Sequence, residues 1–324
     1  MTKIEVVGHE KIQEIFKREA EQNKLSHAYL LAGPDQIGKK TIALWLTQFL
    51  FCAETDKPCG NCPACKQVAN LTHPDLFLLE RLPDKKTFRI EQIRTLQKSL
   101  SFKPYSAIYK VAIIDQAEFL NEESANALLK LLEEPPPYSL IFLVTHTPSK
   151  LLPTILSRVR QLRFSKLNKA QVLTFLQEQP APSSNAESIA LLCRGRIGWA
   201  LEAMQNPETM PEILEYAKTF ENLLFHTFHE RLSIADQWLT SKKDSSLILY
   251  YLLLWWQDLL FLTLKKPEYL HFNFACFPYT ASLSPEKITA YLDLLSGTIA
   301  DGFYNLNKRL VWENLLIQMP SFSK

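Results

Sequence analysis

The apolar residues in the first half of the chain fall into short runs bounded by turn residues. Five of these runs predict buried strands, at 28–32, 76–79, 109–114, 140–144 and 161–164. Between them, apolar residues at helical spacing predict helices at about 39–52, 90–100 and 122–132. Strands that alternate with helices in this way are typical of a parallel sheet covered by helices on both faces.

After Phe164 the strand pattern stops and helical patterns continue to the end of the chain. Proline, glycine or charged residues interrupt them at 180–184, 195–198, 207–211, 242–244, 266–267 and 284–285. We therefore expect three parts. An α/β domain with an insertion at 52–65 spans residues 1–166, a small helical domain spans 167–208, and an all-α domain spans 209–324.

The segment from Leu247 to Leu264 is apolar enough to approach the length of a membrane span. Asp258 interrupts it, and a carboxylate at mid-membrane is unfavourable. Its aromatic residues have aliphatic neighbours at helical spacing, which favours packing in a core or interface over stacking on bases; they are Tyr250, Tyr251, Trp255, Trp256 and Phe261. We expect a buried helix and no membrane association.

Composition narrows the classes of function. The chain has 36 Lys and Arg against 34 Asp and Glu, so its formal charge is +2, which argues against tight DNA binding by the chain alone. A hydrophobic content of 47% is ample for packed cores. Residues 1–5 lack the apolar run of a signal peptide, so we expect a cytoplasmic protein.

Four of the six cysteines lie close together, at Cys52, Cys59, Cys62 and Cys65. Four thiolates in a tetrahedral array suit a structural Zn²⁺, which is the favoured interpretation. An iron–sulfur cluster of the bacterial ferredoxin type needs a cysteine where Ala69 stands, and unliganded thiols are a third possibility. The two remaining cysteines, 193 and 276, are isolated, and we assign them no role.

Residues 33–41 follow the first predicted strand and read Gly-Pro-Asp-Gln-Ile-Gly-Lys-Lys-Thr. In a phosphate-binding loop, a glycine and four residues precede Gly-Lys and then Ser or Thr, whose hydroxyl holds Mg²⁺. Gly33, Gly38 and Lys39 match, but Lys40 takes the place of the hydroxyl. Thr41 comes one residue late, about 100° further around the helix. The sequence thus predicts a degenerate nucleotide site, at which ATP or ADP binds without hydrolysis or not at all.

A working site also needs an acidic residue at the end of a neighbouring strand, to hold Mg²⁺ and activate water. Asp115 ends the third predicted strand, as required. In the large class of ring-shaped ATPases a glutamate usually follows, but here Gln116 follows, and Glu118 comes two residues later. An active ATPase would require Thr41 and Glu118 to take over the two vacant roles. An ordinary turn between strand and helix is the alternative to any nucleotide site.

Several segments resemble bacterial clamp-loader subunits of the AAA+ class. They are residues 27–34, the four-cysteine insertion, and residues 114–118, 126–136 and 151–159. The resemblance is dense from about residue 27 to 164, and the run from Asn305 to Leu316 is similar to the end of the same subunits.

The resemblance implies a subunit of the loader of bacterial DNA polymerase III, which opens the ring-shaped sliding clamp and places it on primed DNA. The implied partners are the motor subunits that hydrolyse ATP and the subunit that opens the clamp. The resemblance also implies that residues 167–208 form a lid and that residues 209–324 form part of a collar joining the subunits. DNA polymerase activity would belong to the complex, not to this chain.

In this family, an arginine within a Ser-Arg-Cys motif reaches the ATP of a neighbouring subunit. Ser157-Arg158-Val159 matches it, so the resemblance implies that Arg158 is such a finger, with Ser157 beside it. The family's second sensor arginine is replaced by Gly198, with Arg196 two residues away. The favoured reading is a non-hydrolysing subunit that supplies Arg158. The alternatives are an ATP-hydrolysing motor subunit and, outside this class, a zinc-dependent nucleic-acid-binding module.

Overall fold

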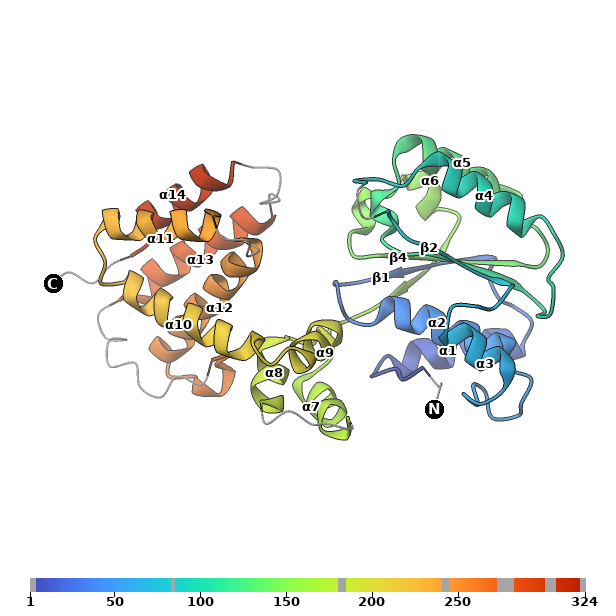
Figure 1. Cartoon of the computed structure of the whole chain (residues 1–324), viewed down its shortest axis with the longest axis horizontal. Helices are drawn as coiled ribbons and strands as arrows, with labels where there is room; N and C mark the ends of the chain where they lie inside the picture. Colours follow the sequence, from blue (N-terminus) through green and yellow to red (C-terminus); the bar gives the residue numbers. More distant parts are fainter. Residues whose placement is uncertain are drawn as a thin grey trace. The chain divides into compact units, whose positions relative to one another are not determined.

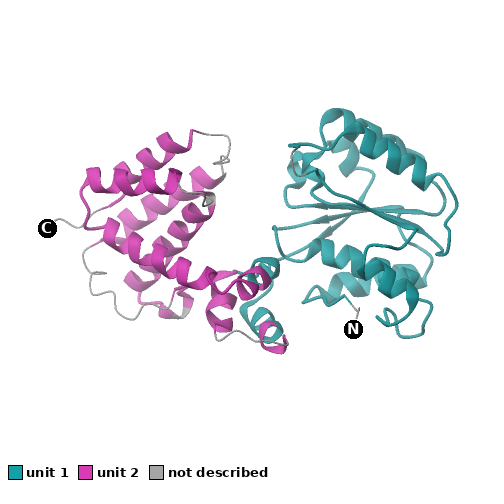
Figure 2. Ribbon diagram, viewed as in Figure 1, with its two compact units in different colours: residues 1–175, 194–200 teal, residues 176–193, 201–324 magenta. Residues whose placement is uncertain are grey.

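The computed structural model describes residues 4–82, 85–179, 185–240, 245–272, 283–300 and 307–320. The chain forms two compact units, shown in Figure 2, one of residues 1–175 and 194–200 and the other of residues 176–193 and 201–324. The divisions fall within two of the helices of the predicted small domain. The three-domain boundaries given above stay a prediction.

The first unit is built on a parallel sheet of five strands. They are β1 (Ala28–Ala32), β2 (Leu76–Leu79), β3 (Lys110–Ile114), β4 (Ser139–Thr145) and β5 (Arg160–Arg163). Their order is β2-β3-β4-β1-β5, and every adjacent pair is parallel. The predicted α/β fold with a parallel sheet is confirmed, and the predicted strands agree with the observed ones to within one residue at each end.

Helices cover both faces of this sheet (Figure 1). One face carries α1 (Glu10–Glu21), α2 (Lys39–Phe51) and α3 (Pro63–Ala69), and the other carries α4 (Ile90–Leu100), α5 (Glu122–Glu133) and α6 (Pro153–Leu156). Because side chains alternate along a strand, Leu31 of β1 packs in the same core as Ile42 of α2, whereas its neighbour Leu30 packs with Leu128 of α5. The pattern analysis predicted α2, α4 and α5 but not the other three helices.

The remaining elements are short 3₁₀ turns and the helices that follow the sheet. The turns are η1 (Ala117–Phe119), η2 (Pro148–Lys150) and η3 (Pro267–Tyr269). The helices are α7 (Lys169–Glu178), α8 (Ala186–Leu192), α9 (Ile197–Gln205), α10 (Thr209–Leu223), α11 (Phe228–Thr240), α12 (Ser245–Thr263), α13 (Pro285–Ala300) and α14 (Lys308–Gln318).

The apolar helix α12 lies in the core of the second unit. Tyr251, Trp255 and Trp256 are buried there, which confirms core packing for these three aromatic residues. The side chain of Asp258 is fully buried and accepts hydrogen bonds from the backbone N–H groups of His271 and Phe272, at 2.9 and 2.8 Å. Within the described residues, we find no helix with the length and hydropathy needed to span a membrane.

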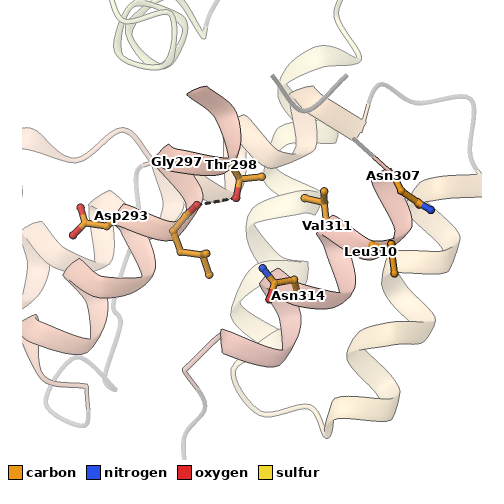
Figure 3. A pocket seen from close by; sticks show the side chains of 8 residues that line it. Asp293, Gly297, Thr298, Asn307, Leu310, Val311 and Asn314 are labelled. Carbon is orange, nitrogen blue, oxygen red and sulfur yellow. Dashed lines mark hydrogen bonds between the residues drawn. The ribbon is translucent and has the colours of Figure 1, made fainter. Parts of the chain in front are cut away.

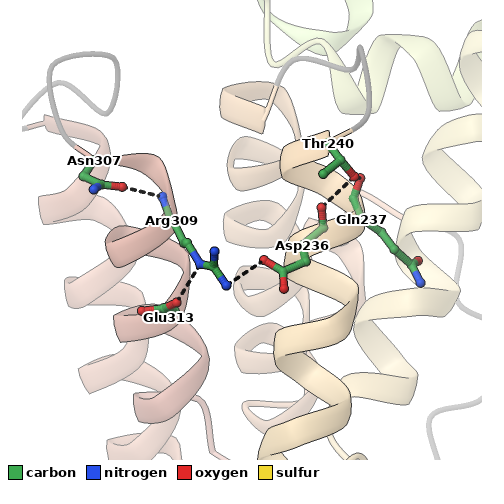
Figure 4. Close-up of polar contacts among 6 residues, drawn as sticks. All are labelled: Asp236, Gln237, Thr240, Asn307, Arg309 and Glu313. Atoms are coloured by element: carbon green, nitrogen blue, oxygen red, sulfur yellow. Dashed lines mark hydrogen bonds and ion pairs between the residues drawn. The ribbon is translucent and has the colours of Figure 1, made fainter.

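Two arginines connect helices α11 and α14 in different ways. Arg231 of α11 is buried, and its guanidinium donates to the carbonyl groups of Leu223 and Met319, at 2.8 and 2.9 Å. Arg309 of α14 instead forms exposed ion pairs with Glu313, at 3.1 Å, and with Asp236 of α11, at 3.5 Å (Figure 4). The buried arginine ties three elements together, whereas exposed pairs of the second kind contribute little to stability.

Some sequence-based expectations concern residues outside the described ranges. They are the chain breaks at 180–184 and 242–244, the isolated Cys276, and Asn305 at the start of the C-terminal resemblance.

Candidate functional site

The phosphate-loop segment joins β1 to α2 at the carboxyl edge of the sheet. A Cβ atom at Gly33 would lie 2.5 Å from the carbonyl oxygen of Phe164, so only glycine fits beside the residue that follows β5. Gly38 is the N-cap of α2 with φ of 92°, a left-handed conformation that glycine adopts without strain. The local structure therefore requires glycine at both positions of the motif. Together the two glycines direct the loop into the first turn of α2.

Lys39 lies in the first turn of α2 and is largely buried, with 6% of its surface exposed. Its Nζ donates a hydrogen bond to the carbonyl oxygen of Pro34 in the same loop. Burial lowers the pKa of Lys39, while the negative charges of Asp35, Glu118 and Asp115 act in the opposite direction. An incoming phosphate would have to replace the Pro34 carbonyl as the partner of this amine.

Lys40, at the position of the missing hydroxyl, forms ion pairs with two carboxylates. Its Nζ contacts Glu80, just after β2, and lies 3.7 Å from Oδ2 of Asp115, just after β3. Burial raises the pKa of Asp115 above its ordinary value, and the Lys40 charge opposes that rise. The predicted residues Lys39, Lys40 and Asp115 thus meet at one edge of the sheet, with a lysine ammonium beside the metal-binding carboxylate.

Gln116 lies at the position of the carboxylate that activates water in an ATPase, and Glu118 is the acidic residue that follows it most closely. Gln116 has φ of 56° and turns the chain out of β3 into η1. The side chain of Glu118 is fully buried and forms an ion pair with Nδ1 of His146, the residue after β4. Burial alone would raise the pKa of Glu118, but hydrogen bonds from His146 and Thr145 outweigh it, so the pKa is lowered.

The sequence analysis missed His146. The Glu118 carboxylate raises the pKa of its imidazole, with hydrogen bonding as the largest contribution. A signal was present in the sequence, because the polar pair Thr145-His146 ends the fourth predicted strand, and parallel strands bring their carboxyl ends to one edge. His146 joins the charged side chains around the loop and forms an ion pair with Glu118, the acidic residue that the sequence offers in place of the missing glutamate.

Helix α9 begins directly against the phosphate-loop segment. The backbone N–H of Gly198 donates to the carbonyl oxygen of Gln36 at 2.8 Å. A Cβ at Gly198 would lie 3.2 Å from both Cβ and the carbonyl oxygen of Gln36, closer than most real Cβ contacts. The residue in the sensor position is therefore part of a backbone contact with the loop, and a larger side chain there would push the two segments apart.

Arg158 follows α6, whose Ile155 packs in the core on the opposite sheet face from α2. Its guanidinium donates to the carbonyl oxygen of Thr154 at 3.0 Å and to Oγ of Ser157 at 3.3 Å, and pairs with Glu133 at 2.8 Å. The Arg158 side chain is 36% exposed. It is thus oriented by its own helix but partly open to the surface, and the structure does not group it with Lys39.

The four clustered cysteines meet as predicted from their spacing. All four Sγ atoms lie within 4.8 Å of one another, with Cys59 and Cys65 4.0 Å apart and Cys52 and Cys62 3.9 Å apart. Four sulfurs around a tetrahedral Zn²⁺ with bonds of about 2.3 Å would be separated by roughly 3.8 Å. The geometry fits a metal ion such as zinc.

Backbone N–H groups support the sulfurs of this cluster. Those of Asn61 and Cys62 point at Sγ of Cys59, at 3.4 and 3.3 Å, and lower the pKa of that thiol to about 7. The side-chain amide of Gln48 in α2 donates to the carbonyl oxygen of Cys65 at 2.8 Å. Burial raises the pKa of the Cys52 and Cys65 thiols, so among these three cysteines the backbone N–H groups favour a thiolate at Cys59 alone. The cluster is fastened to the helix that starts at the phosphate loop.

The second unit carries a groove of about 590 Å³ between α13 and α14 (Figure 3). Its lining combines the Asp293 carboxylate with apolar side chains such as Leu310 and Val311 and the amides of Asn307 and Asn314. This lining brings together no set of residues suited to acid–base or nucleophilic chemistry, and it suits packing against another surface.

Comparison with known proteins now decides the family. A family model described as "DNA polymerase III, delta subunit" matches residues 8–168. The "DNA polymerase III subunit delta'" of Bacillus subtilis (strain 168) is 32% identical over 237 residues, which cover 73% of this chain and 71% of that protein. The chain belongs to the DNA polymerase III delta-prime family. It is a clamp-loader subunit.

Further relatives are similar to smaller or larger parts of the chain. The delta-prime subunit of Pseudomonas aeruginosa is 42% identical over 138 residues, or 42% of each chain. The "DNA polymerase III subunit tau" of Bacillus subtilis (strain 168) is 34% identical over 171 residues, which cover 52% of this chain but 30% of that longer protein. Among solved structures, a gamma subunit-related protein of Thermotoga maritima aligns over 95% of this chain and 97% of its own, with 21% identity and a TM-score of 0.47.

Membership in the delta-prime family gives the chain its setting in DNA replication and implies other loader subunits as partners. The match to the delta-family model includes the phosphate-loop segment, the cysteine cluster and Arg158. The matched range thus includes all three sites, and the chemistry of each site has to be argued from its own surroundings.

Proposed function

We propose that this clamp-loader subunit does not hydrolyse ATP and that it supplies Arg158 to the active site of a neighbouring motor subunit. It would act in loading the sliding clamp onto primed DNA by completing and supporting the loader. Its own phosphate loop keeps Gly33, Gly38 and Lys39, so ATP or ADP binding without turnover is compatible with this role.

The observation that carries the first part is that Gln116 follows Asp115 and that Glu118 is held in an ion pair with His146. Gln116 cannot act as a base, and the buried Glu118 is engaged in this ion pair. Recruiting Glu118 would require its ion pair with the partly exposed His146 to break. The vacant metal hydroxyl at Lys40 and the glycine at position 198, packed on Gln36, support the same conclusion.

The surroundings of Arg158 support the second part. It lies after a helix on the sheet face opposite α2, and it is partly exposed. Ser157 and the Thr154 carbonyl orient the guanidinium without burying it. An arginine supplied across an interface stabilises charge on the transferred phosphoryl group and raises the rate by about 10³–10⁵.

We also propose that Cys52, Cys59, Cys62 and Cys65 hold a structural Zn²⁺. The four sulfurs lie within 4.8 Å of one another, and four sulfur ligands would fill a tetrahedral zinc shell and leave no position for water or substrate. The residue range 209–324 is the proposed contact region with the other loader subunits, because it contributes a helical bundle beyond the nucleotide-binding fold.

The first part is tested by measuring ATP hydrolysis of the purified chain alone, with Lys39→Ala as the control. We expect phosphate release at the background level, and no difference between the two proteins, because Gln116 replaces the usual base and Glu118 is paired with His146. Steady turnover by the wild-type chain that Lys39→Ala abolishes would show an active motor and overturn the proposal.

A further inference from the structure

We propose that the ammonium group of Lys40 is a built-in replacement for the Mg²⁺ ion of a phosphate-loop site. The inference deepens the proposed function and rests on it, because a hydrolysing site would need the metal. It concerns how the pocket is kept stable and closed to divalent cations, which loss of hydrolysis alone does not explain.

The position of Lys40 makes this replacement possible. The residue after the loop lysine normally brings a hydroxyl to the metal, and a lysine side chain from the same point reaches further. Here its Nζ pairs with Glu80 and lies 3.7 Å from Oδ2 of Asp115. The positive charge thus stands between the ends of β2 and β3, in contact with the carboxylate that the fold offers to Mg²⁺.

The residues present do not fit a metal ion as well. Mg²⁺ bound to Asp115 at about 2.1 Å would lie within about 6 Å of the Lys40 ammonium. Two cations at this distance repel each other, and the metal would also need an octahedral shell of oxygens where the lysine side chain lies. A tethered ammonium has no such geometric demand.

Replacement rather than simple loss is supported by the carboxylates that remain. Asp115 is kept, mostly buried, at the end of β3, and a carboxylate in that setting without a nearby cation would be unfavourable. Lys40 supplies that cation permanently and also pairs with the more exposed Glu80. The charge balance of the pocket therefore becomes independent of metal and nucleotide.

The test is Mn²⁺ binding, measured by electron paramagnetic resonance on the full chain without nucleotide. Lys40→Thr restores the hydroxyl of the motif, Lys40→Met removes the charge at similar length, and Lys98→Thr on α4 is the control for an exposed lysine. We expect wild type and Lys98→Thr to bind alike, and each Lys40 variant to gain one bound Mn²⁺ that a second change, Asp115→Asn, removes.

The inference is overturned if the wild-type chain binds Mn²⁺ in a way that Asp115→Asn abolishes, or if the folded Lys40 variants gain no Mn²⁺. Should both Lys40 variants fail to fold, the wild type compared with Asp115→Asn still decides whether Mg²⁺-type binding occurs at this pocket. The assay contains no ATP, so its failure is distinct from the finding of turnover that would overturn the proposed function.

Discussion

Single side chains decide what this nucleotide fold can do. At three places where a phosphate-loop ATPase carries a hydroxyl, an acid and an arginine, this chain has Lys40, Gln116 and Gly198. The structure gives each a definite local partner or conformation: an ion pair with Asp115, a left-handed turn, and a backbone contact with Gln36. Each substitution is therefore accommodated by its surroundings, and restoring one of the three residues would not restore ATP hydrolysis.

The ion pair between the buried Glu118 and the partly exposed His146 predicts a pH dependence. The pKa of His146 is raised above 6.5, so the folded chain binds this proton more tightly than the unfolded chain does. That contribution to stability is complete below pH 6.5 and is lost as the pH rises through the raised pKa. The pKa of Glu118 is lowered from 4.5, so its contribution is present above pH 4.5 and is lost as the pH falls through the lowered pKa. The pair should therefore stabilise the fold most between pH 4.5 and pH 6.5.

The measurement is the free energy of unfolding of the wild type and of His146→Gln across this range, with the exposed His229→Gln as the control. Glutamine keeps an amide donor for Glu118 but not the charge. We expect the stability difference for His146→Gln to shrink as the pH rises above 6.5 through the raised pKa. A difference that stays constant with pH would show that the pair is not ionic.

Strands and helices of the first unit position the charged side chains of the nucleotide pocket and the cysteine cluster. Parallel strands bring Glu80, Asp115 and His146 to one edge of the sheet because each follows a strand in the same direction. The cysteine cluster is fastened to the far end of α2 through Cys52 and Gln48, while the phosphate loop begins the same helix. One helix thus connects the two sites that the sequence separates.

The cysteine cluster gives a prediction at this scale. Cys62→Ser removes one of four sulfurs, so we expect loss of bound zinc and a less ordered segment around residues 52–65, with the sheet intact. Zinc content by mass spectrometry, on protein purified without chelator, is the readout, and circular dichroism follows the sheet.

Cys193→Ser is the matched control, since this buried cysteine lies outside the cluster and should leave the zinc content unchanged. Wild-type protein without zinc, or Cys62→Ser that keeps it, would contradict the proposed structural site.

Much of this arrangement was predictable because it depends on periodicity and spacing. Apolar runs located all five strands, and the spacing of Cys59, Cys62 and Cys65 brought their sulfurs together as expected. The polar residues after the fourth predicted strand could have drawn attention to His146, but its pairing with Glu118 of η1 was missed because no local pattern joins residues so far apart in sequence. The contact of Gly198 with Gln36 was missed for the same reason, since it depends on where α9 packs.

At the scale of the whole chain, two compact units divide the work of one loader subunit. The first holds the phosphate-loop segment, the cysteine cluster and Arg158, and the second adds a helical bundle with a buried core around α12. Family membership places this combination in the DNA polymerase III clamp loader. We propose that the chain has a structural and assisting role there, with its own nucleotide pocket inactive and Arg158 directed to another subunit.

The most direct test of this account is ATP turnover by the reconstituted loader with single changes in this subunit alone. We predict that Lys39→Ala leaves turnover unchanged. Arg158→Ala should lower the hydrolysis rate at the neighbouring active site by about 10³-fold or more. The control, Arg163→Ala at an exposed position, should behave like wild type. A loader slowed by Lys39→Ala but not by Arg158→Ala would contradict the central claim.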